Sequence, residues 1–526
     1  MHADAECRWK RFGRTAVSLG VIAALSACAV GPDFKKPVAP ATAGYSVTPL
    51  ADIQKAGDMD GGAAQRFLAD KDIDFEWWRQ FNCPQLNSLV QRAFKANPTI
   101  TAAQANLKQA MELVYAQQGY FFPTIGAGYN VQRQLLAGNM GGNSPGIQGN
   151  GSVISTYQNP SGPAPYNGGV IYNMHTAQVT VGYTPDVFGA NRRAVESLDA
   201  QARMAQFQME ATYITLASNV VAAAIQEAST RAQLAATRQL IKDNEKALEI
   251  LQTQFKNGFV MRMDVAAQES ALAQARQALP PLEKQFEQTR DLIRMLAGNM
   301  PGTDVSEVFE FKDLHLPEDL PASLPSKLIE QRPDVRAAEE QMRSANAQVG
   351  SAVAARLPQF SITGAWGGTA TEFNQMFSTG GPFWSLIAGF TQTVFDGNTL
   401  KHRQLSAEQG LIQAAEQYRS TVLTAYQNVA DTLHAIESDA DALKAASDAE
   451  VAAKVTLDLT HQQESIGFVN YQTYLAAEIA YQQSRLALIQ AQASRFGDTA
   501  ALYQALGGGW WNRDKVAGTT TSASAQ

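Results

Sequence analysis

The chain has 526 residues, a formal net charge of -7 and a charged fraction of only 17%. This length allows a large buried core or several repeats of a smaller unit. An acidic chain without a basic stripe is not typical of nucleic-acid-binding proteins, so we expect no nucleic-acid partner. Two of the three cysteines, Cys7 and Cys28, lie in or at the end of an N-terminal targeting segment, and no disulfide framework is predicted.

The N-terminus has the pattern of a bacterial export signal. Four basic residues precede an apolar stretch at 15–27, which is too short to cross a bilayer as a permanent helix. The stretch ends in the letters LSAC, which resemble a bacterial lipobox with Cys28 as the modified residue. This resemblance implies removal of 1–27 and acylation of Cys28, for example with palmitate, so that an extended segment at 28–73 is anchored to a membrane. A plain signal peptidase site after Ala27 is the alternative.

Three segments occur twice in the same order, which indicates an internal duplication. The first match aligns Pro98 with Pro333 and Pro123 with Pro358. The matched segments are 97–128 with 332–363, VGYTPDVFGAN (181–191) with AGFTQTVFDGN (388–398), and GFV (258–260) with GFV (467–469).

The third match also keeps its spacing, because 40 residues separate Gly258 from Gly298 and Gly467 from Gly507. We therefore predict two repeats after the N-terminal segment, followed by a disordered tail. Their predicted bounds are 74–330, 331–511 and 512–526.

Each repeat is predicted to begin with a helix of about 24 residues between its matched prolines, because proline is tolerated in a first turn and breaks a helix interior. Apolar residues then alternate with small or polar ones. This pattern predicts strands at about 124–134, 172–184, 358–368 and 384–395. Such strands are typical of a membrane β-barrel, although a soluble antiparallel sheet gives the same alternation. The insertion at 134–170 is rich in Gly, Asn, Ser and Pro and is predicted to be an exposed loop.

A long helix is predicted after each pair of strands. Residues 191–257 contain no proline and no glycine, and residues 398–466 contain a single glycine, Gly410. Each helix would be roughly 100 Å long, whereas helices in compact domains average about 11–12 residues. The pattern indicates a coiled coil, a helical solenoid or a tunnel wall. Glycine would support a reversal of the chain at Gly258 and Gly467.

Further segments resemble a known family, namely DFEWWRQFNCPQLNSLVQRAFKANP (74–98) and QRPDVRAAE (331–339). With the duplication, they resemble the TolC-like outer membrane factor family, and the lipobox resembles its NodT-type group of RND efflux lipoproteins. The resemblance runs from Cys28 to about Trp511. Cys83 departs from the family pattern, in which an acidic residue is usual.

This resemblance implies an α+β membrane protein with a duplicated unit. Four strands per chain would contribute to a trimeric 12-stranded outer-membrane β-barrel, and the long helices would form a periplasmic tunnel. Independently, four strands cannot close a barrel, which needs about eight, and lipid does not tolerate an open sheet edge. The sequence alone therefore predicts an oligomer, and the resemblance makes it a trimer.

The function implied by the resemblance is that of a passive efflux duct in the outer membrane of a Gram-negative cell. Its partners would be outer-membrane lipid, a periplasmic membrane fusion adaptor and an inner-membrane transporter of the RND or another type. No cofactor and no enzymatic activity are expected. The alternatives are a duct for type I protein secretion and a periplasmic coiled-coil scaffold.

In the family, the turns that follow the long helices meet the adaptor and form the periplasmic gate. The resemblance places the adaptor contacts at Gly258, Phe259, Val260, Gly467, Phe468 and Val469. It places the gate candidates at Asp264, Gln472, Thr473, Ala476 and Glu478. Because relatives often carry Asp at the positions of Thr473 and Ala476, an acidic ring would depend on Asp264. A helix N-terminal cap is the alternative role for Asp264.

Two motifs suggest other chemistry. The letters GNSPG at 142–146 match the G-x-S-x-G pattern of hydrolases, but Pro145 lacks the backbone N–H that an oxyanion hole needs. His461 and Glu464 could lie on one helix face as metal ligands, yet no partner set accompanies them, and a solvated polar face is the simpler interpretation. We expect neither a hydrolase site nor a metal site.

Overall fold

The computed structural model describes residues 29–38, 44–45, 52–68, 71–136, 170–322 and 325–513. Cys28, the GNSPG motif and residues 514–526 of the predicted tail lie outside these ranges. The predicted start of the disordered tail at 512 was wrong: the Asn512 amide donates hydrogen bonds to Asp72 Oδ2 and the Ile73 carbonyl, and Arg513 forms an ion pair with Glu210. The chain forms two compact units, each of which takes segments from both repeats. The sheet unit comprises Met1–Lys35, Gln109–Ala202 and Gln341–Ala414, and the helical unit comprises Lys36–Lys108, Arg203–Glu340 and Ala415–Gln526.

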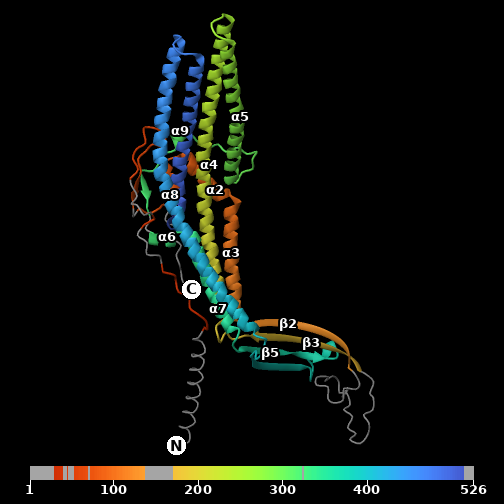
Figure 1. Cartoon of the computed structure of the whole chain (residues 1–526). Helices are drawn as coiled ribbons and strands as arrows, with labels where there is room; N and C mark the ends of the chain where they lie inside the picture. The colour runs from red at the N-terminus through yellow and green to blue at the C-terminus, as the bar shows by residue number, and fades with distance from the viewer. Residues whose placement is uncertain are drawn as a thin grey trace, which may run out of the picture. The chain divides into compact units, whose positions relative to one another are not determined.

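The sheet unit contains a four-stranded antiparallel sheet in the order β2-β3-β5-β6. Its strands are β2 (Thr124–Leu136), β3 (Val170–Tyr183), β5 (Gln359–Ala370) and β6 (Pro382–Thr391), three of which are labelled in Figure 1. They agree closely with the predicted strands, except that β6 ends four residues earlier than 395. The reason is that Thr391 pairs with Gln359, the first residue of β5. Beyond it, the Gln392 side chain donates hydrogen bonds to the carbonyl oxygens of Arg356 and Thr393.

One face of this sheet is apolar. The register places Ile125 opposite Val181 and Ile362 opposite Ala388 on that face. The same face carries the large side chains Tyr129, Phe360, Trp366, Trp384, Leu386 and Phe390. The other face carries mainly Gly, Ser, Thr, Gln and Asn. The single chain leaves the apolar face uncovered, as the 76% exposure of Trp384 illustrates.

The helices also follow the predicted duplication. Helices α3 (Pro98–Gln118) and α7 (Pro333–Ala354) begin at the matched prolines and have 21 and 22 residues. The long helices α4 (Ala190–Lys256) and α8 (Thr399–Ser465) have 67 residues each, within one residue of the predicted bounds. They are followed by α5 (Arg262–Leu296) and α9 (Tyr471–Ala505), with 35 residues each.

The helical unit is held together by one large apolar core. Trp77 and Trp78 belong to a short 3-10 helix, η1 (Trp77–Phe81), and are both only 1% exposed. The ring of Trp77 stacks on that of Tyr503 in α9, with the ring centroids 5.2 Å apart. Cys83 is buried directly before α2 (Pro84–Ala96), and its thiol donates a hydrogen bond to Gln85 Oε1.

Smaller elements complete both units. In the helical unit, β1 (Arg66–Leu68) pairs in parallel with β4 (Asp319–Pro321). The remaining short elements are η2 (Gly119–Phe121), η3 (Phe311–Asp313), α6 (Pro325–Gln331), η4 (Phe373–Gln375) and η5 (Trp510–Asn512). Among the described residues, no helix is both long enough and apolar enough to cross a membrane.

Candidate functional site at the two helical turns

The turns that follow α4 and α8 have the same backbone geometry. Gly258 and Gly467 both have φ +77°, in the left-handed region that favours glycine. In the first turn, Gly258 N–H donates to the Phe255 carbonyl and Phe259 N–H donates to the Gln254 carbonyl. In the second turn, Gly467 N–H donates to the Glu464 carbonyl and Phe468 N–H donates to the Gln463 carbonyl. This pair of bonds is the Schellman motif, which ends a helix and releases the chain in a new direction.

The predicted contact residues differ in exposure. Phe259 and Phe468 are 79% and 80% exposed, which is unusual for phenylalanine. Val260 instead packs against a buried cluster just inside the turn, and Val469 is half-buried. The two phenylalanines are therefore the side chains that the turns present outward.

The N-termini of α5 and α9 are capped by side chains at different positions. In α5 the cap comes from the third helical residue, and in α9 it comes from the residue directly before the helix. In the first repeat, the Asp264 carboxylate accepts a hydrogen bond from Met261 N–H at 3.0 Å. In the second repeat, the Asn470 side chain accepts from Thr473 N–H at 2.9 Å and from the Thr473 hydroxyl at 2.8 Å. Met261 has no side-chain acceptor of comparable strength. The first repeat therefore takes its capping acceptor from the third helical position, whereas the second takes it from the residue before the helix.

The structure does not gather the five gate candidates into one cluster within a chain. Asp264 and Thr473 belong to the caps of different helices. Gln472 and Ala476 are exposed on α9, whereas Glu478 is only 6% exposed.

A buried hydrogen-bond chain links three helices just inside the turns. The Tyr471 hydroxyl donates to Gln268 Oε1 at 2.7 Å, and Gln268 Nε2 donates to Asn244 Oδ1 at 2.7 Å. These residues come from α9, α5 and α4. They lie beside the apolar cluster of Leu251, Val265, Tyr471 and Leu475. Sequence reasoning missed this chain, because a glutamine inside a long helix gives no signal of burial, although Gln268 is 0% exposed.

Glu478 is the unusual carboxylate of this region. Its Oε2 atom is buried without a hydrogen-bond partner. Burial, with the Asp243 carboxylate as a second cause, raises the pKa of Glu478 to about 7. Burial and the carboxylates of Glu478 and Glu464 likewise raise the pKa of Tyr474 to about 12. Glu478 is therefore largely protonated in mildly acidic solution.

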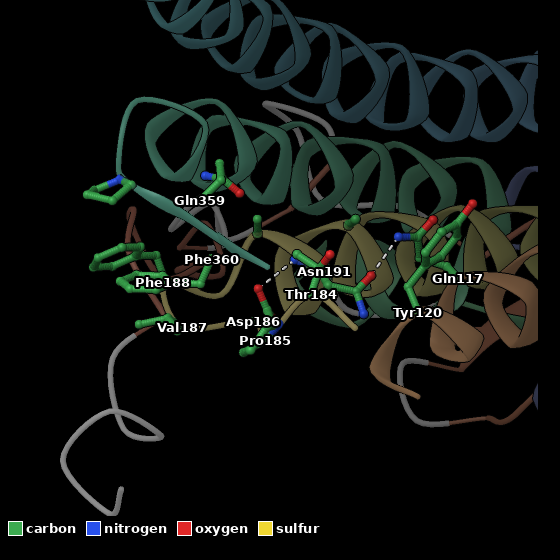
Figure 2. A pocket seen from close by; sticks show the side chains of 13 residues that line it. Gln117, Tyr120, Thr184, Pro185, Asp186, Val187, Phe188, Asn191, Gln359 and Phe360 are labelled. Atoms are coloured by element: carbon green, nitrogen blue, oxygen red, sulfur yellow. Dashed lines mark hydrogen bonds between the residues drawn. The ribbon is translucent and has the colours of Figure 1, made fainter. Parts of the chain in front are cut away.

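A separate cavity of about 340 Å³ lies in the sheet unit, between α3, the start of α4 and the start of β5 (Figure 2). Its polar side chains hold helix ends. Asp186 accepts hydrogen bonds from the backbone N–H groups of Asn191 and Arg192, and Gln117 Nε2 donates to Asn191 Oδ1 (Figure 2). These contacts fix the first turn of α4, so the polar part of this cavity is a structural junction.

The sequence also contains two possible metal ligands on one helix, His461 and Glu464. Within the described ranges, no group of three or more His, Cys, Asp or Glu residues is placed to hold a metal ion. The ring of His461 packs 5.4 Å from that of Tyr474, between ring centroids.

Comparisons with known proteins agree over most of the chain. Residues 89–299 and 324–508 match the family model described as outer membrane efflux protein. The probable efflux pump outer membrane protein TtgC of Pseudomonas putida is 26% identical over 503 residues, which cover 95% of this chain and 96% of that protein. The pyoverdine export outer membrane protein OpmQ of the same species is 26% identical over 443 residues, covering 83% of this chain and 88% of that protein.

Solved structures show the same fold. The outer-membrane channel OprN superposes with a TM-score of 0.77 at 23% identity, covering 92% of this chain and 100% of that chain. The Campylobacter jejuni CmeC outer membrane channel superposes with a TM-score of 0.76 at 19% identity, covering 92% of this chain and 95% of that chain.

Proposed function

Because the chain belongs to the outer membrane efflux protein family, we propose that it is the outer-membrane channel subunit of a tripartite efflux system. It is a passive duct that carries small molecules from an inner-membrane transporter and a periplasmic adaptor to the exterior. The names of relatives support small-molecule cargo, since they include pyoverdine export and toluene efflux proteins.

The observation that carries this proposal is the four-stranded sheet with one apolar face and one polar face. A membrane channel wall needs this arrangement, because alternate residues face lipid and lumen. Strands β2 and β6 are unpaired edges within the chain, and lipid does not tolerate such edges. Copies of the chain close the sheet by pairing β2 of one chain with β6 of the next. Three chains make a 12-stranded β-barrel, as the family resemblance implies.

The two turns are the second part of the proposal. We assign the adaptor contact to Gly258, Phe259, Val260 and their matches in the second repeat, since Phe259 and Phe468 are presented outward. The gate is assigned to the N-terminal turns of α5 and α9. Asp264, Gln472 and Thr473 lie in the first turns, and Ala476 and Glu478 lie in the second turn of α9 and just beyond it.

The chain supplies the path and the transporter supplies the energy. We propose that the protein has neither enzymatic activity nor a cofactor, as expected for a member of the outer membrane efflux protein family. Acylation of Cys28 anchors the mature N-terminus to the outer membrane.

Deleting the gene from its own bacterium tests this function. Cells without the protein should retain a fluorescent dye and toxic organic compounds, and the gene supplied on a plasmid should restore export. The purified protein should have the mass of a trimer and conduct ions in planar bilayers. If deletion of the gene in a strain that lacks every other efflux channel does not change dye retention, the efflux role is ruled out. If the deletion instead abolishes secretion of a protein, type I secretion is supported.

A further inference from the structure

The described chain begins with a short extended segment, residues 29–34, which we call the strap. Val30 N–H donates a hydrogen bond to the Phe188 carbonyl at 3.1 Å. The Arg193 guanidinium donates to the Val30 carbonyl, and the Asn346 amide donates to the Pro32 carbonyl at 2.8 Å. The strap is therefore bound along its backbone to α4 and α7 in the sheet unit.

Side chains fix the strap further. Arg193 is buried and forms ion pairs with Asp33 at 2.9 Å and with Glu196 at 2.7 Å. The Arg343 guanidinium lies over the Phe34 ring, 4.9 Å from its centroid.

The backbone of the strap also fits too closely for larger residues at two points. A Cβ atom on Gly31, which has φ +97°, would lie 2.4 Å from the Cα atom of Gly350. A Cβ atom on Gly189 would lie 2.7 Å from the Cα atom of Ala29. Ala29 is therefore held directly beside Gly189.

An apolar groove opens beside this point, on the apolar face of the sheet. It has a volume of about 370 Å³ and is lined chiefly by Pro185, Val187, Phe360, Ile362, Ala388 and Phe390. The groove continues to the strap through Phe188, whose ring centroid lies 6.3 Å from that of Phe360 (Figure 2). Phe390 remains 68% exposed in the chain, so the groove leaves apolar surface that a hydrocarbon chain would cover favourably.

We propose that an acyl chain carried by Cys28 lies in this groove, so that the strap docks the lipid against the wall of its own channel. The inference rests on the proposed outer-membrane function and on acylation of Cys28. Two facts support it: Ala29, which follows Cys28 in the sequence, packs against Gly189 beside the groove, and Val30 and Pro32 are fixed there by hydrogen bonds. The anchor is then an integral part of the sheet unit, with a set position in the membrane.

Photocrosslinking of the full-length trimer in lipid nanodiscs tests the proposal. A photoreactive benzoylphenylalanine replaces Phe390 in the groove, or Leu135 as a matched control. Both positions lie on the apolar face with similar exposures, at 68% and 65%. Leu135 lies near the far end of β2, so it stays away from the groove of its own chain and from that of the next chain. The expected result is a several-fold higher yield of the acylated N-terminal peptide joined to position 390 than to position 135. Equal yields, or crosslinks at 390 to bulk phospholipid only, would overturn the proposal.

A pair of glycine variants tests the strap. Gly31→Val introduces a clash with Gly350 and should reduce the crosslink at 390 to the level at 135. Gly380→Val is the control, because Gly380 also has a positive φ but nothing within 4 Å of an added Cβ; its crosslink should persist. A crosslink that survives in Gly31→Val overturns the role of the strap. The comparison of positions 390 and 135 in the otherwise unaltered chain stands even if Gly31→Val does not fold.

Two further measurements separate failure of this inference from failure of its premises. The mass of the N-terminal peptide before irradiation shows whether Cys28 is acylated; an unmodified terminus removes the ligand and overturns the proposal. Dye export by the same cells reports the efflux function independently. If the cells export dye but show no groove crosslink, the proposed function is retained and only the proposal that the lipid lies in the groove is rejected.

Discussion

Asp264 caps a helix and is also the acidic residue of the proposed channel entrance. Its hydrogen bond to Met261 N–H holds the first turn of α5. A ring of three such carboxylates in a trimer would also attract cations. The two roles make different demands, because the cap needs an acceptor oxygen and the ring needs the charge.

Two substitutions at this position therefore separate the roles. Asp264→Asn keeps an acceptor oxygen and removes the charge, so cation preference in planar bilayers should fall while thermal stability changes little. Asp264→Ala removes both, and should also lower the free energy of unfolding by about 0.5–2 kcal/mol. Single-channel recording beside a melting curve measures both effects. Unaltered selectivity in the Asn variant would leave Asp264 as a capping residue only.

Glu478 is expected to make stability depend on pH. Its pKa is near 4.5 in an unfolded chain and about 7 in the folded one. Because the folded state holds the proton more tightly, the stabilisation is fully present below about pH 4.5 and is lost as the pH rises through 7.

Glu478→Gln, which mimics the protonated acid, should thus raise the free energy of unfolding by about 1–3 kcal/mol at pH 8 and change it little at pH 4. Denaturant unfolding at both pH values measures this. Glu269→Gln is the control, because Glu269 forms a solvent-exposed ion pair with Arg262. Asp439 keeps part of the pH dependence in all variants, since burial and a hydrogen bond with Asp498 also raise its pKa to about 7. An equal gain at pH 4 and pH 8 would contradict the assignment.

At the scale of elements, the turn after α8 is predicted to be a contact surface. Any side chain at Gly467 meets the same backbone penalty of about 1–2 kcal/mol for the left-handed conformation, and no atom lies within 4 Å of an added Cβ. Gly467→Ala and Gly467→Trp should therefore fold and form trimers equally well.

Only the tryptophan should impair dye export, because its ring would obstruct the adaptor. Export rates and native mass measure the two properties. Equal export by both variants would mean that this turn does not meet the adaptor.

The elements that sequence predicted best are those with strong local signals. Helices α4 and α8 end within one residue of their predicted bounds, because an unbroken run of helix formers ends at a glycine that must adopt a positive φ. The end of β6 was overestimated, since alternation continues after the partner strand has ended.

The site was less predictable than the elements. The positions of the two turns could be read from the repeated GFV motif. The burial of Glu478 and the Tyr471–Gln268–Asn244 hydrogen bonds could not, because they depend on which faces of α4, α5 and α9 meet. The contacts of the strap join residues more than 150 positions apart, and no local pattern encodes such pairings.

At the scale of the whole molecule, the proposed acyl chain on Cys28 and the apolar face of the sheet would be two attachments of the protein to the membrane. One acyl chain gives only marginal binding, with an association constant of about 10⁴ M⁻¹, whereas the apolar sheet face of three chains is far larger. Cys28→Ser should therefore abolish labelling by radioactive palmitate and still leave the protein in the outer-membrane fraction. Label that persists in the variant would place the modification on another residue.

Four of the seven tryptophans of this chain lie in two contrasting environments. Trp77 and Trp78 are enclosed in the helical core, whereas Trp366 and Trp384 stand exposed on the apolar face of the sheet. Indole emission is therefore a native optical probe of both units. Lipids that carry bromine atoms should quench the fluorescence of Trp366 and Trp384 but not that of Trp77 and Trp78. Denaturant should shift the emission of Trp77 and Trp78 to longer wavelength. Assembly in the membrane and unfolding of the helical core can thus be followed by light in the unlabelled protein.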